Sequence, residues 1–310
     1  MQLEEADPLS PAPGQLLVRV RAAGVNPVDT YVRAAQFGYS PQLPYTPGAD
    51  AAGVVEAVGE GVTGFSVGQK VYGGRSLSGS YAEQALFDAG QLYPLADRLS
   101  FSQGACIGIP YVTAYVALSW KAQVQPGQTV LIHGASGGVG TAAVQLARRF
   151  QLAVIGTAGS PQGRALVEEQ GAGHALDHRD PAHDQQILKL TQGRGVDVVL
   201  EMLADQNLGS DLTLLAPEGK VVVIGSRGSV QLDPRELMAR NGSILGMRLM
   251  NVPSHRYREI HAALAEGFQD GTFRPVIGKE FPLAEAAQAH RIVMTPPAYG
   301  NVVLLIPQSS

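Results

Sequence analysis

Residues 130–140 read VLIHGASGGVG, an apolar run that passes directly into a glycine-rich turn. With Ala135 in the first glycine position, the spacing Ala135-x-Gly137-x-x-Gly140 is typical of the first turn in a dinucleotide-binding βαβ unit. The glycines let the backbone approach a pyrophosphate, and the start of the next helix favours its negative charge. A glycine-rich turn also occurs without any ligand. A second apolar strand expected at residues 153–157 has the spacing of a βαβ unit and favours dinucleotide binding.

The sequence around this turn alternates between short apolar strands and helical stretches. This alternation predicts the α/β class, with a parallel, doubly wound sheet covered by helices on both faces. The expected strands are residues 129–133, 153–157, 174–176, 196–200 and 220–224, and the expected helices are residues 138–150, 162–170, 181–191 and 208–215. A strand at residues 243–249 and a helix at residues 254–270 extend the pattern.

Residues 14–102 have a different pattern, with short strands between glycine and proline turns. The expected strands are residues 16–20, 53–59, 69–72 and 81–86, and the tail at residues 273–307 returns to strand and turn character, with a last apolar strand at residues 301–306. We therefore expect a β-rich domain made of residues 1–102 and 271–310, and a dinucleotide-binding domain made of residues 103–270.

The composition indicates a globular protein of the cytoplasm. The 310 residues are 45% hydrophobic and carry a net charge of −4, so a chain-wide basic surface for nucleic acid or anionic membrane is absent. A single cysteine, Cys106, excludes an intramolecular disulfide and a multi-cysteine zinc site. The acidic N-terminus does not resemble a secretory signal, and no apolar run approaches the ~20 residues that span a bilayer.

The segment after the expected second strand bears on the choice of nicotinamide cofactor. An NAD enzyme places Asp or Glu there to bind the ribose 2′-hydroxyl. Residues 156–164 read GTAGSPQGR, and the first acid comes well into the following helix. Ser160 and Arg164 are nearby donors for a 2′-phosphate, and His178 and Arg179 follow the third strand at the same edge. NADPH is therefore favoured, although Arg164 could equally be a solvated helix residue.

Four stretches carry a family resemblance: residues 24–31 (GVNPVDTY), 43–48 (LPYTPG), 107–115 (IGIPYVTAY) and 133–140 (HGASGGVG). On these motifs the chain resembles the zinc-free quinone oxidoreductases of the medium-chain dehydrogenase/reductase superfamily, and within them the zeta-crystallin family. The resemblance covers essentially the whole chain. It implies a GroES-like catalytic domain from both chain ends, an inserted Rossmann domain, an active site in the cleft, NADPH as cofactor and a quinone as substrate.

The same family has further residues before the stretch that matches the start of this sequence, including the first strands of the catalytic domain. Loss of a partner strand there would leave backbone donors and acceptors around residues 16–21 unpaired.

The resemblance also implies a reaction without a metal. Zinc-dependent relatives have a cysteine in the segment that matches residues 24–29 and a Gly-His-Glu in the segment that matches residues 48–50. This chain has Asn26 and Ala49 in those segments, and it lacks the four-cysteine zinc lobe.

Asn26 and Tyr31 match the family's substrate slot, where an amide and a phenol can donate to quinone oxygens. Tyr31 is also implied as a cofactor contact, and Thr113 as a contact of the nicotinamide. The alternatives are that Asn26 belongs to a simple turn, that Tyr31 is a core aromatic, and that Thr113 caps a helix.

The other cofactor contacts implied by the resemblance follow the carboxyl ends of the parallel strands, where a doubly wound sheet binds its ligand. They are Ser136, Gly137, Gly138 and Val139 at the pyrophosphate, Gly159 and His178 beside Arg164 at the adenosine end, Asn207, Ile224, Gly225, Ser226 and Arg227 after the next two strands, and Met247, Arg248 and Leu249 at the nicotinamide end. His178 and Arg227 could equally be surface residues. Cys106 is expected to be a buried structural thiol, and His133 to serve packing rather than catalysis.

Three functions are compatible with these observations. The first is quinone reduction by one-electron or two-electron transfer, the one-electron type releasing semiquinone. The second is NADPH-dependent reduction of an alkenal or enone, which the motifs do not separate from the first. The third, implied only by the resemblance, is a lens crystallin role with binding of AU-rich mRNA 3′-untranslated regions. The net charge opposes RNA binding unless basic residues cluster in space, such as Arg235, Arg240, Arg248, Arg256 and Arg258.

Residues 243–249 also bear on assembly, because they are expected to form the last strand of the parallel sheet. This stretch contains no proline that would prevent edge pairing. An edge strand can pair with its copy across a two-fold axis. We therefore expect a homodimer or homotetramer, as the resemblance also implies.

Overall fold

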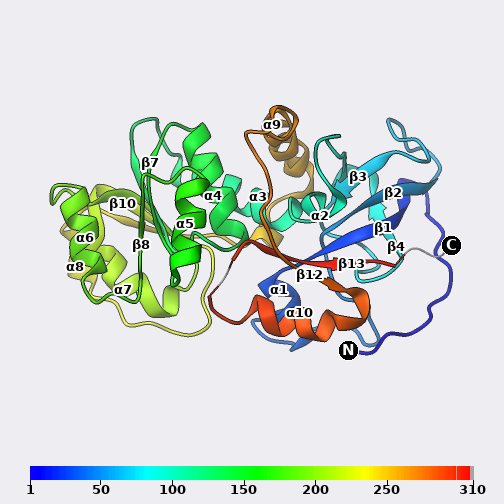
Figure 1. Ribbon diagram of the computed structural model, residues 1–310, viewed down its shortest axis with the longest axis horizontal. Helices are drawn as coiled ribbons and strands as arrows, with labels where there is room; N and C mark the ends of the chain where they lie inside the picture. The colour runs from blue at the N-terminus through cyan, green and yellow to red at the C-terminus, as the bar shows by residue number, and fades with distance from the viewer. Residues whose placement is uncertain (298, 308–310) are drawn as a thin grey trace. The chain divides into compact units, whose positions relative to one another are not determined.

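The computed structural model describes residues 1–297 and 299–307, which form two compact units. Unit 1 comprises Met1–Val112, Pro253–Pro296 and residues 300–307, so both ends of the chain contribute to it. Unit 2 comprises Thr113–Val252 together with Pro297 and Tyr299. Figure 1 shows the elements of both units along the chain.

In its described residues, unit 2 contains a six-stranded parallel sheet in the order β11-β10-β9-β6-β7-β8. The strands are β6 (Thr129–Ile132), β7 (Ala153–Thr157), β8 (His174–Leu176), β9 (Val196–Glu201), β10 (Leu215–Val223) and β11 (Ser243–Gly246). The helices are α3 (Gly108–Tyr115), which begins in unit 1, α4 (Gly138–Arg149), α5 (Pro161–Glu169), α6 (His183–Leu190), α7 (Ala204–Leu214) and α8 (Pro234–Met238). The predicted doubly wound sheet is confirmed.

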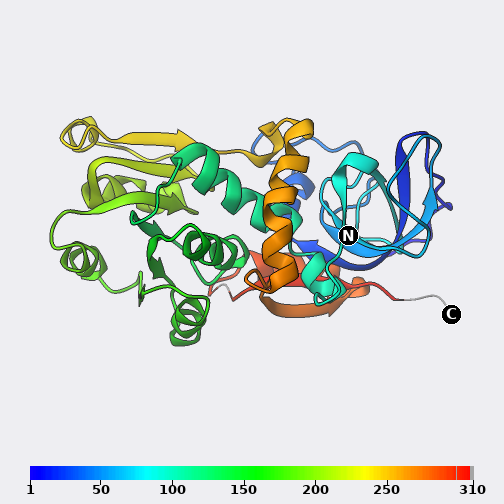
Figure 2. The same cartoon turned by 90° about the horizontal axis from the view of Figure 1, so that it is seen from above.

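The strand order reverses between β6 and β9. The chain moves outward from β6 to β7 and β8, then returns to β9 and moves outward the other way to β10 and β11. Right-handed crossovers therefore place α4 and α5 on one face of the sheet and α6 and α7 on the other (Figure 2). The carboxyl ends of β6 and β9 lie at this reversal, where a sheet of this kind binds its ligand.

The predicted edge strand is confirmed in position but not in length. β11 lies at the edge of the sheet and ends at Gly246. Met247–Leu249 were expected in the same strand, and the structure corrects this. The Met247 N–H still donates to the Val223 carbonyl at 2.9 Å, but a 3-10 turn begins at Leu249 and ends the pairing.

The described part of unit 1 contains a seven-stranded sheet in the order β12-β13-β1-β2-β3-β5, with β4 paired to β1. Its strands are β1 (Gln15–Val25), β2 (Ala51–Val58), β3 (Lys70–Gly73), β4 (Gln84–Asp88), β5 (Leu92–Pro94), β12 (Ile277–Pro282) and β13 (Asn301–Leu305). Its helices are α1 (Pro27–Arg33), α2 (Phe101–Gly104), α9 (Tyr257–Asp270) and α10 (Ala286–Val293). α10 lies in the tail expected to be strand and turn, which is a further correction, and its Ala286, Ala289 and His290 pack into the core.

The backbone groups around residues 16–21 are paired in the structure. β1 pairs with β2 along one edge. Along the other edge it pairs first with β4 and then, from Ala22 to Val25, with β13. Between these two partners, the Val20 N–H donates to the Glu83 carbonyl, and the Arg21 carbonyl accepts from Ile306. Both edges of β1 are therefore satisfied within the described chain.

Two segments expected in the dinucleotide-binding domain lie in unit 1, namely residues 103–112 and 253–270. Within unit 1, α2 packs against β1 and β2. α9 packs through aromatic contacts, because His261 stacks on Tyr93 at 3.7 Å and Phe268 contacts Tyr111 edge-to-face. These contacts explain why α9 belongs to unit 1, although the sequence pattern placed it with the helices that cover the parallel sheet.

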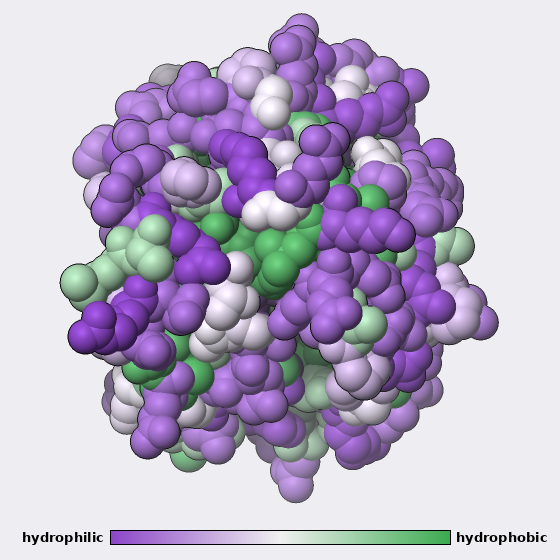
Figure 3. All heavy atoms as spheres, turned by 90° about the vertical axis from the view of Figure 1, so that its left-hand side faces the viewer, coloured by the Kyte–Doolittle hydropathy of each residue, from purple (hydrophilic) through white to green (hydrophobic). Residues whose placement is uncertain are grey.

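The surface of the molecule is mainly polar on the side shown in Figure 3, with an apolar patch near the centre of that face. No helix in the described residues is long and apolar enough to cross a membrane.

The glycine turn provides a test of the packing between β6 and α4. A Cβ at Gly140 would lie 2.4 Å from the Gly134 carbonyl oxygen and 2.6 Å from the Ala135 Cα. Because both are backbone atoms, Gly140→Ala should lower the free energy of unfolding by about 1–3 kcal/mol. Gly209→Ala in α7 is the matched control, since its Cβ would meet only an ordinary contact at 3.8 Å. The control should gain about 0.4–1 kcal/mol. Denaturant titration checks both values, and an unchanged Gly140→Ala variant would contradict the packing argument.

Candidate active site

The glycine turn between β6 and α4 has the geometry of a phosphate site. Gly134 adopts φ +58°, and Gly137 caps α4 in an extended conformation. Gly137, Gly138 and Val139 are partly exposed at the start of this 12-residue helix, which has no acidic residue in its first turn. The free N–H groups and the helix dipole therefore face an accessible surface. Ser136 is buried, and its hydroxyl lies beside Gly163 at the start of α5.

The end of β7 is bordered by basic side chains. A Cβ at Gly159 would lie 2.8 Å from His178 Nε2 and 3.7 Å from Arg179 Nε, so both side chains approach this glycine. The Asp177 carboxylate pairs with Arg179 at 3.2 Å and with Arg164 at 2.7 Å. These interactions, with that of Arg179 the larger, hold the pKa of Asp177 well below its usual value. Arg164 is thus an ion-pair partner rather than a solvated residue.

The loops after β9 and β10 are joined through backbone groups. The Glu201 carbonyl oxygen accepts from the N–H groups of Ile224 and Gly225 at 2.9 and 3.2 Å. Gly225 leaves no room for a side chain, because its Cβ would lie 2.4 Å from the Met202 carbonyl. Asp205 accepts from the Arg227 N–H at 2.7 Å, while the Arg227 side chain is exposed.

The remaining predicted contacts of these loops have structural partners. Asn207, in α7, donates to both carboxylate oxygens of Glu201 at 3.3 Å. The Ser226 hydroxyl donates to the Gly228 carbonyl at 3.0 Å. After β11, Met247 is buried, Leu249 is half-buried and Arg248 is exposed.

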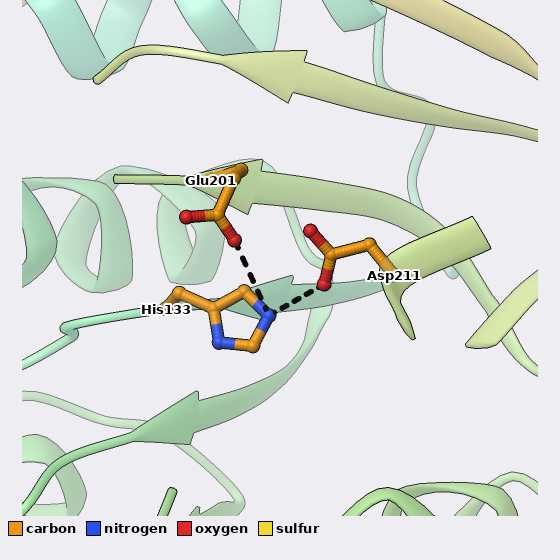
Figure 4. A group of neighbouring side chains, drawn as sticks. All are labelled: His133, Glu201 and Asp211. Carbon is orange, nitrogen blue, oxygen red and sulfur yellow. Dashed lines mark hydrogen bonds and ion pairs between the residues drawn. The ribbon is translucent and has the colours of Figure 1, made fainter. Parts of the chain in front are cut away.

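A buried polar cluster lies at the strand reversal, and sequence reasoning missed most of it (Figure 4). His133 Nε2 lies 2.8 Å from Asp211 Oδ1 and 3.6 Å from Glu201 Oε2. All three side chains are buried, and one nitrogen or oxygen atom from each lies within 4.8 Å of the other two. His133 was expected to serve packing alone. Two features of the sequence could have indicated this cluster. One acid ends the apolar run of β9, and a second acid stands at position 211, next to the core residue Leu212.

The predicted substrate residue Asn26 lies in a second buried network, in unit 1. Asn26 is the N-cap of α1, and its backbone N–H donates to Asp29 Oδ2 at 2.8 Å. Its side-chain Nδ2 donates to Asp50 Oδ2 at 3.1 Å, and the same oxygen accepts from the Ile109 N–H at 2.8 Å. The Tyr81 hydroxyl donates to Asp29 at 3.2 Å. Asp50 therefore determines which end of the Asn26 amide is nitrogen.

Burial controls the ionisation of these two acids. Desolvation raises the pKa of Asp29 to about 7 and that of Asp50 to about 8, because neither carboxyl has a cationic partner within hydrogen-bonding distance among the described residues. Carboxyls with such raised pKa values mark candidate functional positions.

The other predicted residues have plain structural settings. Tyr31, in α1, is half-buried and packs edge-to-face on Phe37 at 4.9 Å. Thr113 is buried inside α3, which begins at Gly108, so it does not cap that helix. Cys106 is buried as expected, and burial raises the pKa of its thiol.

Comparison with known proteins agrees with this architecture. A family model for the alcohol dehydrogenase GroES-like domain matches residues 12–97, and one for zinc-binding dehydrogenase matches residues 138–266. A solved NAD-dependent alcohol dehydrogenase is similar, with a TM-score of 0.91, 29% identity and coverage of 99% of this chain and 96% of that chain. A mycobacterial protein solved as a complex with NADPH has a TM-score of 0.89, with 30% identity and coverage of 98% and 94%. A GroES-like domain joined to a Rossmann domain defines the medium-chain dehydrogenases/reductases.

The particular family is given by a close sequence match. The quinone oxidoreductase of Sus scrofa is 46% identical over 307 residues, which are 99% of this chain and 93% of the relative. The chain belongs to the quinone oxidoreductase (zeta-crystallin) family of this superfamily and is an oxidoreductase. The predicted fold class, with its GroES-like and Rossmann parts, is confirmed.

The buried Asp50 carboxyl predicts a pH dependence of stability. The folded state holds a proton on Asp50 at pH values where the unfolded chain, with a pKa near 3.8, has released it. Stability should therefore fall as the pH rises from about 4 toward 8. Asp50→Asn keeps an acceptor for Asn26 and Ile109 but cannot lose a proton. It should reduce the slope of unfolding free energy against pH by up to about 1.4 kcal/mol per pH unit.

Denaturant titrations between pH 4 and 8 measure this slope. The exposed Asp88→Asn is the control and should keep the original slope. An Asp50→Asn slope equal to that of the unsubstituted protein would show that Asp50 is ionised throughout this range.

Proposed function

We propose that the chain reduces quinones with NADPH and without a metal ion. The 46% identity to a quinone oxidoreductase supports the substrate class. NADPH supplies the reducing equivalents when it is bound. The observation that carries the cofactor choice is the end of β7, where Gly159 faces His178 and Arg179 and no acid occurs in residues 156–164.

The glycine turn fits a dinucleotide. Gly137, Gly138 and Val139 present accessible backbone at the start of α4, and the absence of a side chain at Gly140 keeps that helix close to the turn. We assign the pyrophosphate to this position. The similar mycobacterial protein, which binds NADPH, supports the assignment.

The charge at the adenosine end favours a 2′-phosphate. Arg164 and Arg179 share one carboxylate, Asp177, so this group carries a net positive charge. Guanidinium groups bind phosphate through charge-assisted hydrogen bonds. An NAD site would instead need an acid near Gly159 to accept from the ribose 2′-hydroxyl.

The Asn26 amide is the group we assign to the quinone. An amide nitrogen has two hydrogens, and Asp50 accepts one of them. The other hydrogen can donate to a quinone oxygen as negative charge develops there. Tyr31 supplies a second donor through its phenol. Because the carboxyl group of Asp50 accepts one hydrogen of the amide, this donor is oriented before the substrate arrives.

The residues of this network also support a reaction without zinc. The neutral Asn26 amide occupies the segment in which zinc-dependent relatives have a cysteine, and Ala49 has no ligand atom. The buried Cys106 thiol has a raised pKa, which opposes the thiolate form that binds metal.

Cofactor preference is the first test. NADPH should bind at least tenfold more tightly than NADH, which corresponds to about 1.4 kcal/mol. Arg179→Gln should weaken NADPH binding about tenfold and leave NADH binding unchanged, because only NADPH carries the 2′-phosphate. Arg194→Gln is the matched control, since Arg194 pairs with Asp197 at the opposite end of the sheet. Fluorescence titration gives the dissociation constants, and equal values for the two cofactors would refute the assignment.

Activity is the second test. With NADPH, ortho-quinones should be reduced, and extensive chelation should leave the rate within about twofold. Asn26→Ala should lower kcat/KM by about 10²-fold, as for loss of one donor to a developing oxyanion. Faster turnover of alkenals than of any quinone would favour the alternative enone reductase. Activity that disappears on chelation and returns with Zn²⁺ would show that a metal takes part.

A further inference from the structure

We propose that Asp211 and Glu201 share one proton in a buried relay that runs through His133 to the glycine turn, and that this relay positions the cofactor-binding loops. The relay residues come from three places: His133 follows β6, Glu201 ends β9 and Asp211 lies in α7 (Figure 4). The proposed effect on NADPH rests on the function proposed above, whereas the relay itself does not.

The hydrogen-bond geometry at the glycine turn accommodates a neutral His133, and burial lowers the pKa of this imidazole. The Thr157 hydroxyl oxygen lies 3.4 Å from the Gly134 N–H, which donates to it. The same oxygen lies 3.3 Å from His133 Nδ1, so its own hydrogen can donate to that nitrogen. His133 Nδ1 is then the acceptor, and Nε2 carries a hydrogen that it donates to Asp211 Oδ1 at 2.8 Å. The imidazole is neutral in this arrangement.

The two carboxyl groups then need a proton between them. Asp211 Oδ2 is buried and has no hydrogen-bond donor among the described residues. Glu201 and Asp211 lie within hydrogen-bonding reach of each other, and burial raises the pKa of both. Two ionised carboxylates beside a neutral imidazole would be costly in this setting. One shared proton satisfies Asp211 Oδ2 and leaves a single negative charge.

Glu201 connects this proton to the loops at the carboxyl edge of the sheet. Its carboxylate accepts from the Leu203 N–H and from Asn207 Nδ2, and its carbonyl accepts from Ile224 and Gly225. The other end of the relay holds the N–H of Gly134, which opens the glycine turn. The shared proton therefore lies in the hydrogen-bonded chain that connects the glycine turn to the loops after β9 and β10, all of which we assign to NADPH.

The other charged groups near the cluster come from α6 and from the segment after β8. His183 and Asp184 of α6 form a pair with 3.1 Å between Nε2 and Oδ1, and both act on Asp211. Asp184 opposes ionisation of Asp211, and His183 favours it when charged. His178 interacts electrostatically with His133. None of these groups donates a hydrogen bond to Asp211 Oδ2.

The sign of the pH effect follows from charge. Loss of the shared proton adds a second negative charge to the cluster next to the turn assigned to the pyrophosphate. Because the pyrophosphate is anionic, this charge repels it. Cofactor binding should therefore weaken as the pH rises, by about tenfold between pH 6.5 and 8.5, since one proton linked over one pH unit changes affinity up to tenfold. NADH is the suitable probe, because its phosphates do not titrate in this range.

Asp211→Asn tests the shared proton directly. The new amide can donate to Glu201 in place of the proton, and its oxygen can still accept from His133. The variant should fold, bind NADH at pH 6.5 within about threefold of the original affinity, and show no loss at pH 8.5. Asp197→Asn, at the opposite end of β9, should retain the original pH dependence. An Asp211→Asn profile that matches the original would overturn the proposal.

Two measurements keep the proposal testable if Asp211→Asn does not fold. Calorimetry of NADH binding to the unsubstituted protein, in buffers of different ionisation enthalpy, should show proton uptake near pH 8, and its absence would overturn the proposal. After dialysis against chelator, metal analysis should find no bound ion. A stoichiometric metal that Glu201→Gln removes would overturn it as well.

Failure of the relay proposal can be distinguished from failure of the proposed function. If neither NADPH nor NADH binds to the folded protein, the proposed function fails. The relay is then tested by the unfolding free energy of the free protein, which should fall less steeply between pH 6.5 and 8.5 in Asp211→Asn than in Asp197→Asn. Equal slopes would contradict the relay.

Discussion

Where the strand order of the parallel sheet reverses, the chain leaves β6 and β9 toward opposite sides of the sheet, and the polar groups buried there need partners. The backbone satisfies this requirement first, since the His133 N–H donates to the Leu200 carbonyl and the Glu201 carbonyl receives two N–H groups from the loop after β10. The side chains satisfy the rest, because His133, Asp211 and Glu201 fill the space behind the turn. The glycine turn, the loop after β9 and the loop after β10 all take their positions from this one point.

The buried acids of the two units have different kinds of hydrogen-bond partner. In unit 2 an imidazole contacts the buried carboxyls directly. In unit 1, Asp29 and Asp50 have only neutral donors, namely a backbone N–H, an amide and a phenol, among the described residues. Neutral donors do not offset the cost of burying a negative charge, so burial raises the pKa of Asp29 to about 7 and that of Asp50 to about 8 and favours their neutral forms. The Asn26 amide therefore donates to a carboxyl group that burial favours in its neutral form.

The sequence predicted the parts of the fold that depend on local pattern. The glycine turn, the alternating strands and helices and the edge position of β11 all follow from periodicity and turn chemistry. Contacts between distant residues were not accessible in this way. Nothing near Asn26 in the chain indicates that Asp50 orients its amide, and nothing near His133 indicates Asp211, which is 78 residues away. α10 was missed because its short amphipathic pattern lies in a tail dominated by strand signals.

The pairing of β1 with β13 has a consequence for the order in which the protein becomes complete during synthesis. Unit 2 has all of its parallel strands once β11 has been made, whereas Ala22–Val25 of β1 wait for residues 302–305. Nascent chains generally fold domain by domain as they emerge. The strand that leads into Asn26 therefore remains open along one edge until residues 302–305 have been synthesised. A chain that ends before β13 would keep the strands of the parallel sheet and leave Ala22–Val25, which lead into Asn26, without this partner.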